Sequence, residues 1–220
     1  MLQIKRFVCN VIQENCYVVS DETQEAVIID CGAQFEAERQ AIKNYIESNH
    51  LRPVHLLATH GHVDHNIGNK FVFDTWGLKV ELHKDDEPLI STLSEQAEQF
   101  MRQELAKDEQ PPVGRYLEEN DTITFGTHTL QVIETPGHSQ GSVFFWCKDE
   151  KVAFSGDTLF RNSVGRADLP GGSMFLLIQS LRMVCQLDDD TRILPGHGEE
   201  TTVGRELASN PYLHSSPSTP

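Results

Sequence analysis

The stretch Thr59-His60-Gly61-His62-Val63-Asp64-His65 places three imidazoles and a carboxylate within seven residues. A single histidine is usually satisfied by a backbone carbonyl or by solvent. Three so close together indicate a metal ion, because neutral imidazole is the commonest protein ligand for zinc and similar ions. His60 and His62 can converge on one ion from a looped backbone, whereas Asp64 and His65 point differently and are available to a second ion. The spacing also differs from that of His-Glu-x-x-His, whose histidines share one face of a helix.

The apolar run at residues 54–58 directly precedes this stretch, and three later places repeat the order of an apolar strand followed by a metal-competent side chain. They are Pro136-Gly137-His138, Gly156-Asp157 and Pro195-Gly196-His197. Proline sets the angle at which the chain enters such a turn, and glycine lets the backbone come close to a crowded site. If the strands share a direction, all four candidates meet at one sheet edge. We therefore expect a common site.

The apolar periodicity predicts an alternation of strands and helices along the chain. Polar residues 85–112 carry apolar residues at helical spacing, at Phe100, Met101 and Leu105. We interpret that segment as a solvated surface helix, in preference to a lid over a pocket. The expected strands are residues 4–11, 16–19, 26–29, 53–58, 78–82, 122–125, 130–134, 142–147, 152–155 and 192–194, and the expected helices are residues 35–48, 67–76 and 173–187.

Length and composition set the size of the folded unit. With 220 residues, 38% of them hydrophobic and 23% charged, the chain can bury a full core. We expect a single domain over residues 1–208. Residues 209–220 are rich in serine and proline and show no periodicity, so we expect a frayed tail there.

The charge of the chain bears on its partners. The formal net charge of -15 repels a phosphate backbone, so nucleic acid is not an expected partner. Two bound divalent cations would offset part of that charge locally and attract small anions. No apolar run approaches the length of a membrane span, and the first six residues lack an apolar signal core, so a cytoplasmic location without membrane contact is expected. Nothing in the sequence predicts the oligomeric state.

A family resemblance joins these motifs. The set His60, His62, Asp64, His65, His138, Asp157 and His197 resembles the ligand signature of the metallo-β-lactamase fold. Residues 15–17, residues 156–160 and residues 195–198 extend the similarity to the short glyoxalase II-like branch, which is hydroxyacylglutathione hydrolase-like. The resemblance implies an α+β fold, a four-layer αββα sandwich of two mixed sheets with helices outside.

The same resemblance implies two divalent metal ions, with zinc expected and iron or manganese as alternatives. His60, His62 and His138 would hold one ion, and Asp64, His65 and His197 would hold the other. Asp157 would bridge the two ions and hold a bridging hydroxide, which Asp64 would help to orient. No cysteine occupies a position in this set, unlike the β-lactamase subclasses that use a thiolate ligand.

The chemistry expected of such a site is acyl transfer to water. Coordination lowers the pKa of water from about 16 to near 7, and cations stabilise the tetrahedral oxyanion. A thiolate leaving group, with a pKa of about 8.5, departs without obligatory protonation. We therefore expect a small acyl thioester substrate, such as the 2-hydroxyacylglutathione S-lactoylglutathione.

Recognition of glutathione depends on residues beyond the ligand set. Arg166 matches the position of a basic residue that helps to bind glutathione in glyoxalase II, where the element reads Gly-Lys-Phe-Tyr. Asp168 replaces its tyrosine, so Arg166 and Asp168 could instead form a local salt bridge. The segment after His197 is too short for the helical region that supplies further basic contacts in full-length members of that family.

Two other functions remain open from the sequence. A mononuclear iron persulfide dioxygenase on the same fold is the alternative enzyme, because its members also resemble this chain at Gly165-Arg166 and Asp168. A protein that binds metal without catalysis is the third hypothesis, and the complete ligand set disfavours it.

Overall fold

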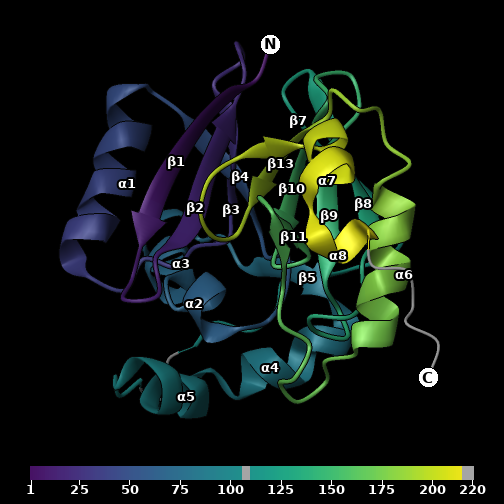
Figure 1. Ribbon diagram of the computed structural model, residues 1–220. Helices are drawn as coiled ribbons and strands as arrows, with labels where there is room; N and C mark the ends of the chain where they lie inside the picture. The colour runs from purple at the N-terminus through teal and green to yellow at the C-terminus, as the bar shows by residue number, and fades with distance from the viewer. Residues whose placement is uncertain (106–109, 215–220) are drawn as a thin grey trace.

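Two mixed β-sheets pack face to face with helices on their outer sides (Figure 1). The structure is a computed structural model that describes residues 1–105 and 110–214. The four-layer αββα sandwich expected from the family resemblance is confirmed.

The first sheet begins as an antiparallel meander and continues with parallel strands. β1 pairs with β2 and β2 with β3 in antiparallel fashion, whereas the β3–β4, β4–β5 and β5–β6 pairs are parallel. The strands, in their order across the sheet, are β1 (Gln3–Cys9), β2 (Glu14–Ser20), β3 (Glu25–Ile29), β4 (Arg52–Leu57), β5 (Val80–His83) and β6 (Arg115–Leu117).

The second sheet is antiparallel except at one central pair. β10 pairs in parallel with β13, and the other neighbours are antiparallel. Its strands, in order, are β14 (Thr201–Thr202), β13 (Arg192–Pro195), β10 (Val152–Gly156), β9 (Val143–Cys147), β8 (His128–Glu134) and β7 (Thr122–Phe125). A short hairpin of β11 (Leu159–Phe160) and β12 (Ser163–Val164) follows β10.

The helices cover the two outer faces and one end of the sandwich. In Figure 1, α1 lies outside the first sheet and α6 outside the second. Ser173 caps the N-terminus of α6 through its side-chain oxygen, as its residue type favours. The helices are α1 (Glu36–Ser48), α2 (Val63–Asn66), α3 (Asn69–Trp76), η1 (Lys84–Asp86), α4 (Glu87–Ser91), α5 (Leu93–Gln96), the π-helix η2 (Ala97–Met101), α6 (Met174–Val184), α7 (Val203–Ser209) and α8 (Pro211–His214).

Strand alternation builds separate apolar layers. Successive residues of a strand face opposite sides of the sheet, so Val27 and Ile29 of β3 pack between the sheets while Ile28 faces the helical layer of α1. The inter-sheet layer includes Tyr17, whose ring meets that of Phe154 edge to face with centroids 5.3 Å apart. Both faces of the central strands are therefore buried, which explains their nearly continuous apolar sequences.

The prediction of one surface helix over residues 85–112 is wrong. The chain there forms η1, α4, α5 and η2, because Pro88 starts a new helix and Thr92 interrupts it. Met101 is buried in the core beneath the first sheet, and Phe100 lines a cavity. Residues 106–109 lie outside the described residues.

The expected tail also differs from the structure over its first residues. Ser209 ends α7, and Asn210 is buried with its side-chain amide donating to the Ser163 carbonyl at 3.0 Å and to Glu206 at 2.8 Å. The chain then forms α8, and Leu213 packs on the outer core of the second sheet. Residues 215–220 lie outside the described residues.

At the start of β8, His128 lies between two carboxylates. Its Nδ1 is 3.0 Å from Asp21 Oδ2, and its Nε2 is 3.0 Å from Glu150 Oε1. Burial alone would lower the pKa of His128, but the hydrogen bonds to Asp21 and Glu150 outweigh it and raise that pKa. The protonated imidazole therefore ties the β2–β3 turn to the second sheet.

We expect the stabilisation from His128 to disappear at alkaline pH. A raised pKa in the folded state stabilises the protein fully below the ordinary histidine value of about 6.5, and the contribution is lost as pH rises through the raised value. His128→Gln should lower the free energy of unfolding more at pH 6 than at pH 9, as measured by urea titration. The control is His50→Asn, at an exposed position whose φ of 54° asparagine also tolerates. Equal losses at both pH values would contradict the assignment.

Candidate metal centre

Strand direction brings the predicted residues to one edge of the sandwich. β8 is antiparallel to β9, β9 is antiparallel to β10, and β10 is parallel to β13, so β8, β10 and β13 run the same way. His138, Asp157 and His197 each follow one of these three strands. The histidine stretch follows β4 of the other sheet, and the four segments meet as expected.

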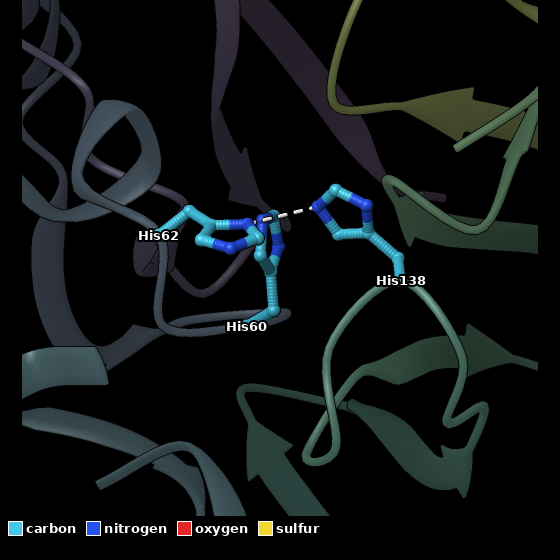
Figure 2. Close-up of side chains that lie close together, drawn as sticks. All are labelled: His60, His62 and His138. Carbon is cyan, nitrogen blue, oxygen red and sulfur yellow. Dashed lines mark hydrogen bonds between the residues drawn. The ribbon is translucent and has the colours of Figure 1, made fainter. Parts of the chain in front are cut away.

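His60, His62 and His138 form one group of imidazoles. Figure 2 shows the three rings turned toward one another, His60 and His62 from the loop after β4 and His138 from the turn after β8. The His60 ring centroid is 4.8 Å from that of each partner, and His62 Nδ1 lies 2.9 Å from His138 Nε2. The side-chain amide of Asn66 donates to the carbonyls of His60 at 2.9 Å and His62 at 2.8 Å, which fixes the loop.

Asp64, His65 and His197 form a second group. Asp64 and His65 belong to the short helix α2, and His197 follows β13. His197 Nε2 is 3.2 Å from Asp64 Oδ2, and His65 Nε2 is 3.7 Å from the same oxygen.

Asp157 lies between the two groups. Its Oδ1 is 3.4 Å from His65 Nε2, and its Oδ2 is 3.6 Å from both His138 Nε2 and His197 Nε2. One carboxylate therefore reaches imidazoles of both groups, which is the geometry expected of a bridging residue.

Hydrogen bonds on the far side of the rings set their orientation. His138 Nδ1 donates to the Arg166 carbonyl at 2.7 Å, and His65 Nδ1 is 3.0 Å from Asp30 Oδ2. Asp30 in turn accepts from the backbone and the hydroxyl of Thr59, each at 2.7 Å. A metal-ligating histidine commonly makes such a bond through its other nitrogen, because the bond fixes the tautomer and the ring plane.

The donor atoms left over fit a metal ion. His60 Nε2, His65 Nε2 and Asp157 Oδ1 are buried and have no hydrogen-bond partner within the described residues. An unpaired buried polar atom carries a desolvation cost that a bound cation removes. Imidazole nitrogens and carboxylate oxygens in this combination suit zinc, iron or manganese.

The pKa values of His60 and His62 are lowered, whereas that of His65 is raised, because their neighbours differ. Burial and the adjacent imidazoles lower the pKa of His60, and burial with His138 lowers that of His62 to about 4, so both rings are neutral and able to bind a cation at pH 7. Burial would also lower the pKa of His65, but the charges of Asp64, Asp157 and Asp30 raise it. In the metal-free protein a proton on His65 therefore offsets part of this negative charge.

Residues of β2 hold the turn that carries His197. The side-chain amide of Asn15 donates to the carbonyls of Pro195 and Gly198, each at 2.9 Å, and the Tyr17 hydroxyl donates to Pro195 at 2.8 Å. A Cβ at Gly196 would stand 2.4 Å from Asp157 Oδ1, so only glycine permits the turn to approach so closely.

A cavity of about 170 Å³ opens over the two groups. Candidate ligands and apolar side chains both line it. The lining residues are Ile12, His62, Val63, Asp64, Gln96, Phe100, His138, Asp157, Arg166, Leu169 and His197.

Arg166 lines the cavity but is already paired. Its Nε and Nη2 donate to the two carboxylate oxygens of Asp168 at 2.7 and 2.8 Å, and both side chains are exposed. The local salt bridge considered from the sequence is therefore present in the structure. The Arg166 backbone carbonyl, by contrast, acts directly on the site through His138.

The sequence did not predict the roles that Asp30, Asn15, the buried Glu14 and the Thr59 hydroxyl have at this site. Asp30 follows an apolar strand, as the other candidates do, and that signal could have identified it. Glu14 lies with Asp30 and His65 in one cluster of potential ligand atoms, and burial raises its pKa. Glu14 is the first residue of β2 and does not follow an apolar strand, so the sequence gives no such signal for it.

Comparison with known proteins agrees with this geometry. The model of the metallo-beta-lactamase superfamily matches residues 9–197. The chain belongs to this superfamily. One relative within it is the hydroxyacylglutathione hydrolase GloC of Haemophilus influenzae, 36% identical over 209 residues that cover 92% of this chain and 94% of that protein.

Two solved structures of the superfamily resemble the chain over nearly its full length. BLEG-1, a B3 metallo-beta-lactamase, has a TM-score of 0.88 and 33% identity, with 97% of this chain and 100% of that chain covered. TTHA1623, solved in a di-iron-bound form, has a TM-score of 0.84 and 35% identity, with 95% and 100% covered. Membership of the superfamily supports a metal-dependent hydrolase.

Two further observations bear on the setting of the site. All five cysteines are free thiols, and four of them are buried. Of the helices in the described ranges, none has both the length and the apolar character needed to span a membrane.

Proposed function

We propose that this chain is a binuclear metal-dependent hydrolase of small acyl thioesters, with 2-hydroxyacylglutathiones such as S-lactoylglutathione as the leading substrates. The observation that carries the proposal is the convergence of five imidazoles and two carboxylates beneath an apolar-walled cavity. The similarity to GloC supports the thioester class, and the similarity to a di-iron protein supports two metal positions.

The chain's residues would divide the work between two positions. His60, His62 and His138 would hold one ion, Asp64, His65 and His197 the other, and Asp157 would contact both. When bound, zinc, iron or manganese lowers the pKa of water and polarises a carbonyl oxygen. The buried rings fix these positions before substrate arrives, so little reorganisation is required during the reaction.

The cavity favours a leaving group that needs no proton. Among the described residues, the ionisable side chains that line it are the paired Arg166 and five of the seven candidate ligands, so no separate side chain is placed there as a general acid. A thiolate leaves without protonation more readily than an amide nitrogen does. This difference supports a thioester over an amide substrate.

The test is hydrolysis of S-lactoylglutathione by the metal-loaded protein, which is monitored through the release of free thiol. We expect turnover that is lost on removal of the metal with a chelator and restored by zinc, iron or manganese. His62→Ala is the negative control, because it removes one ring from the first group without touching Asp157. Equal rates for the wild type and His62→Ala would overturn the proposal.

The same preparation separates the other candidate reactions. Two metal ions per chain without oxygen uptake on glutathione persulfide support the hydrolase, whereas one iron per chain with oxygen uptake supports the dioxygenase. A β-lactam substrate belongs in the panel because BLEG-1 is a B3 metallo-beta-lactamase. A higher kcat/KM for the β-lactam than for every thioester would contradict the proposed substrate class.

A further inference from the structure

We propose that Ile12 and Phe100 form an apolar wall that binds a short, uncharged acyl chain of the substrate. The inference rests on the proposed thioester hydrolysis and names the acyl class that the site prefers. Ile12 and Phe100 line the cavity over the candidate metal centre together with Val63.

Two of these side chains are exposed although they are large and apolar. Ile12 is 40% exposed and Phe100 is 44% exposed, whereas Val63, which also lines the cavity, is only 2% exposed. Apolar surface exposed beside polar ligand atoms is stabilised when a ligand covers it. His62 and Asp64 line the same cavity. A substrate whose reacting carbonyl lies over these two residues would therefore cover the apolar surface with the group attached to that carbonyl.

A buried glutamine joins the two segments that supply this wall. Gln34 Oε1 accepts from the backbone N–H of Val11 at 3.2 Å, and Gln34 Nε2 donates to Gln103 Oε1 at 2.8 Å. Val11 precedes Ile12 in the β1–β2 hairpin, and Gln103 follows η2. Gln34 is only 7% exposed, so one buried side chain sets the spacing of Ile12 and Phe100.

Both segments are also anchored to α2. Asn10 in the hairpin donates through Nδ2 to the Asp64 carbonyl at 2.8 Å. Gln96, just before η2, accepts from the backbone N–H of Val63 at 3.1 Å. These two hydrogen bonds fix the position of the wall relative to Asp64.

The backbone of these segments has uncommon conformations that this placement requires. Phe100 belongs to a π-helix, a form that is rare and often found at functional sites. Asn10 and Gln13 on either side of the hairpin tip have φ of 54° and 62°, in the left-handed region. Strain of this kind persists where the surrounding structure requires it.

The charges around the cavity define the chemistry of the occupant. The cation that lines the cavity, Arg166, belongs to the segment that contacts His138 and is paired with Asp168. Ile12, Val63 and Phe100 carry no charge and offer no side-chain donor to a carboxylate that they would desolvate. The cavity of about 170 Å³ is also smaller than the roughly 300–1,000 Å³ of typical small-molecule sites. An acyl chain of three or four carbons without a charge fits these conditions.

The experiment compares acyl groups on one neutral thiol, so that only the acyl chain changes. Acetyl, propionyl, butyryl and succinyl thioesters of N-acetylcysteamine are hydrolysed by the metal-loaded protein. We expect kcat/KM to rise about tenfold over the two methylenes from acetyl to butyryl, the low end for one methylene in an enclosed pocket, because Ile12 and Phe100 are only partly covered. Succinyl should be the poorest substrate.

Three variants test whether the wall causes the preference for butyryl over acetyl. Phe100→Ala and Ile12→Ala should each reduce the butyryl-to-acetyl ratio of kcat/KM toward one, chiefly because KM rises more for butyryl than for acetyl. Gln34→Ala should have a similar but smaller effect through positioning. Phe175→Ala is the matched control, because this phenylalanine is 70% exposed on α6 and does not line the cavity. An unchanged ratio in both Phe100→Ala and Ile12→Ala would overturn the inference.

A binding measurement keeps this inference separate from the proposed function. Ketone analogues, in which a methylene replaces the thioester sulfur, are titrated calorimetrically into the metal-loaded protein. Absence of thioester turnover would overturn the proposed function, while the wall would still be supported by tighter binding of the butyryl than the acetyl analogue. Equal affinities for the two analogues would overturn the wall.

Discussion

Asp157→Asn is expected to lower kcat/KM for thioester hydrolysis by about a thousandfold or more, a loss at or above that for removing one strong electrostatic contact in an active site. The substitution keeps the shape of the side chain but removes its charge. Both oxygens of Asp157 face imidazoles, Oδ1 toward His65 and Oδ2 toward His138 and His197. Burial would raise the pKa of Asp157, but these imidazoles lower it, so the carboxylate is ionised at neutral pH.

The measurement pairs kinetics with metal analysis. Asp157→Asn should retain less than the wild-type amount of metal at both positions, because the same carboxylate reaches both groups. Asp74→Asn is the matched control, since Asp74 is an exposed carboxylate on α3 that belongs to neither group of candidate ligands. If Asp157→Asn bound the full amount of metal and kept wild-type turnover, the bridging assignment would be wrong.

The layers of the fold follow from local patterns in the sequence. β2 and β3 have apolar residues on both faces, and a strand with that pattern must lie between two other layers. Glycine and proline after β8 and β13 indicated where strands end and where side chains collect. The convergence of His138 and His197 required only that these strands run in the same direction.

The segment over residues 85–112 shows where such patterns are insufficient. Met101 and Phe100 are neighbours in sequence, yet one is buried in the core and the other lines the cavity. A π-helix changes the angular spacing of side chains, so the usual helical period assigns both residues to one stripe. Sequence pattern alone does not reveal that change of period.

The outer ring of the site depends on contacts between distant residues. The sequence pointed to the cationic side chain of Arg166 as a substrate-binding group. In the structure, its backbone carbonyl is the atom that contacts His138. Every residue has such a carbonyl, so residue type carries no signal for it. Asn15 likewise acts on Pro195 and Gly198, which lie 180 and 183 residues away in sequence.

Two buried asparagines hold the two metal-bearing turns in parallel ways. Asn66 donates to the carbonyls of His60 and His62, and Asn15 donates to those of Pro195 and Gly198. Each asparagine therefore supports a different group of candidate ligands. The two groups should respond separately when one asparagine is removed.

Asn15→Ala is expected to weaken binding at the Asp64, His65 and His197 position by about 10- to 100-fold, the usual cost of losing a group that orients a metal ligand. Removing the amide leaves the buried carbonyls of Pro195 and Gly198 without this donor, so the His197 turn gains freedom. The first group should keep its affinity, because Asn66 and the Arg166 carbonyl still hold it. Stepwise calorimetric titration of zinc into the metal-free protein measures the two affinities.

Two further variants make this prediction specific. Tyr17→Phe removes one hydrogen bond to the same turn, at Pro195, and should weaken the second position less than Asn15→Ala does. Asn66→Ala should weaken the first position instead, because it frees the loop of His60 and His62. Equal losses at both positions in all three variants would mean that the asparagines stabilise the fold as a whole. A selective loss would mean that each turn controls the metal occupancy of its own group.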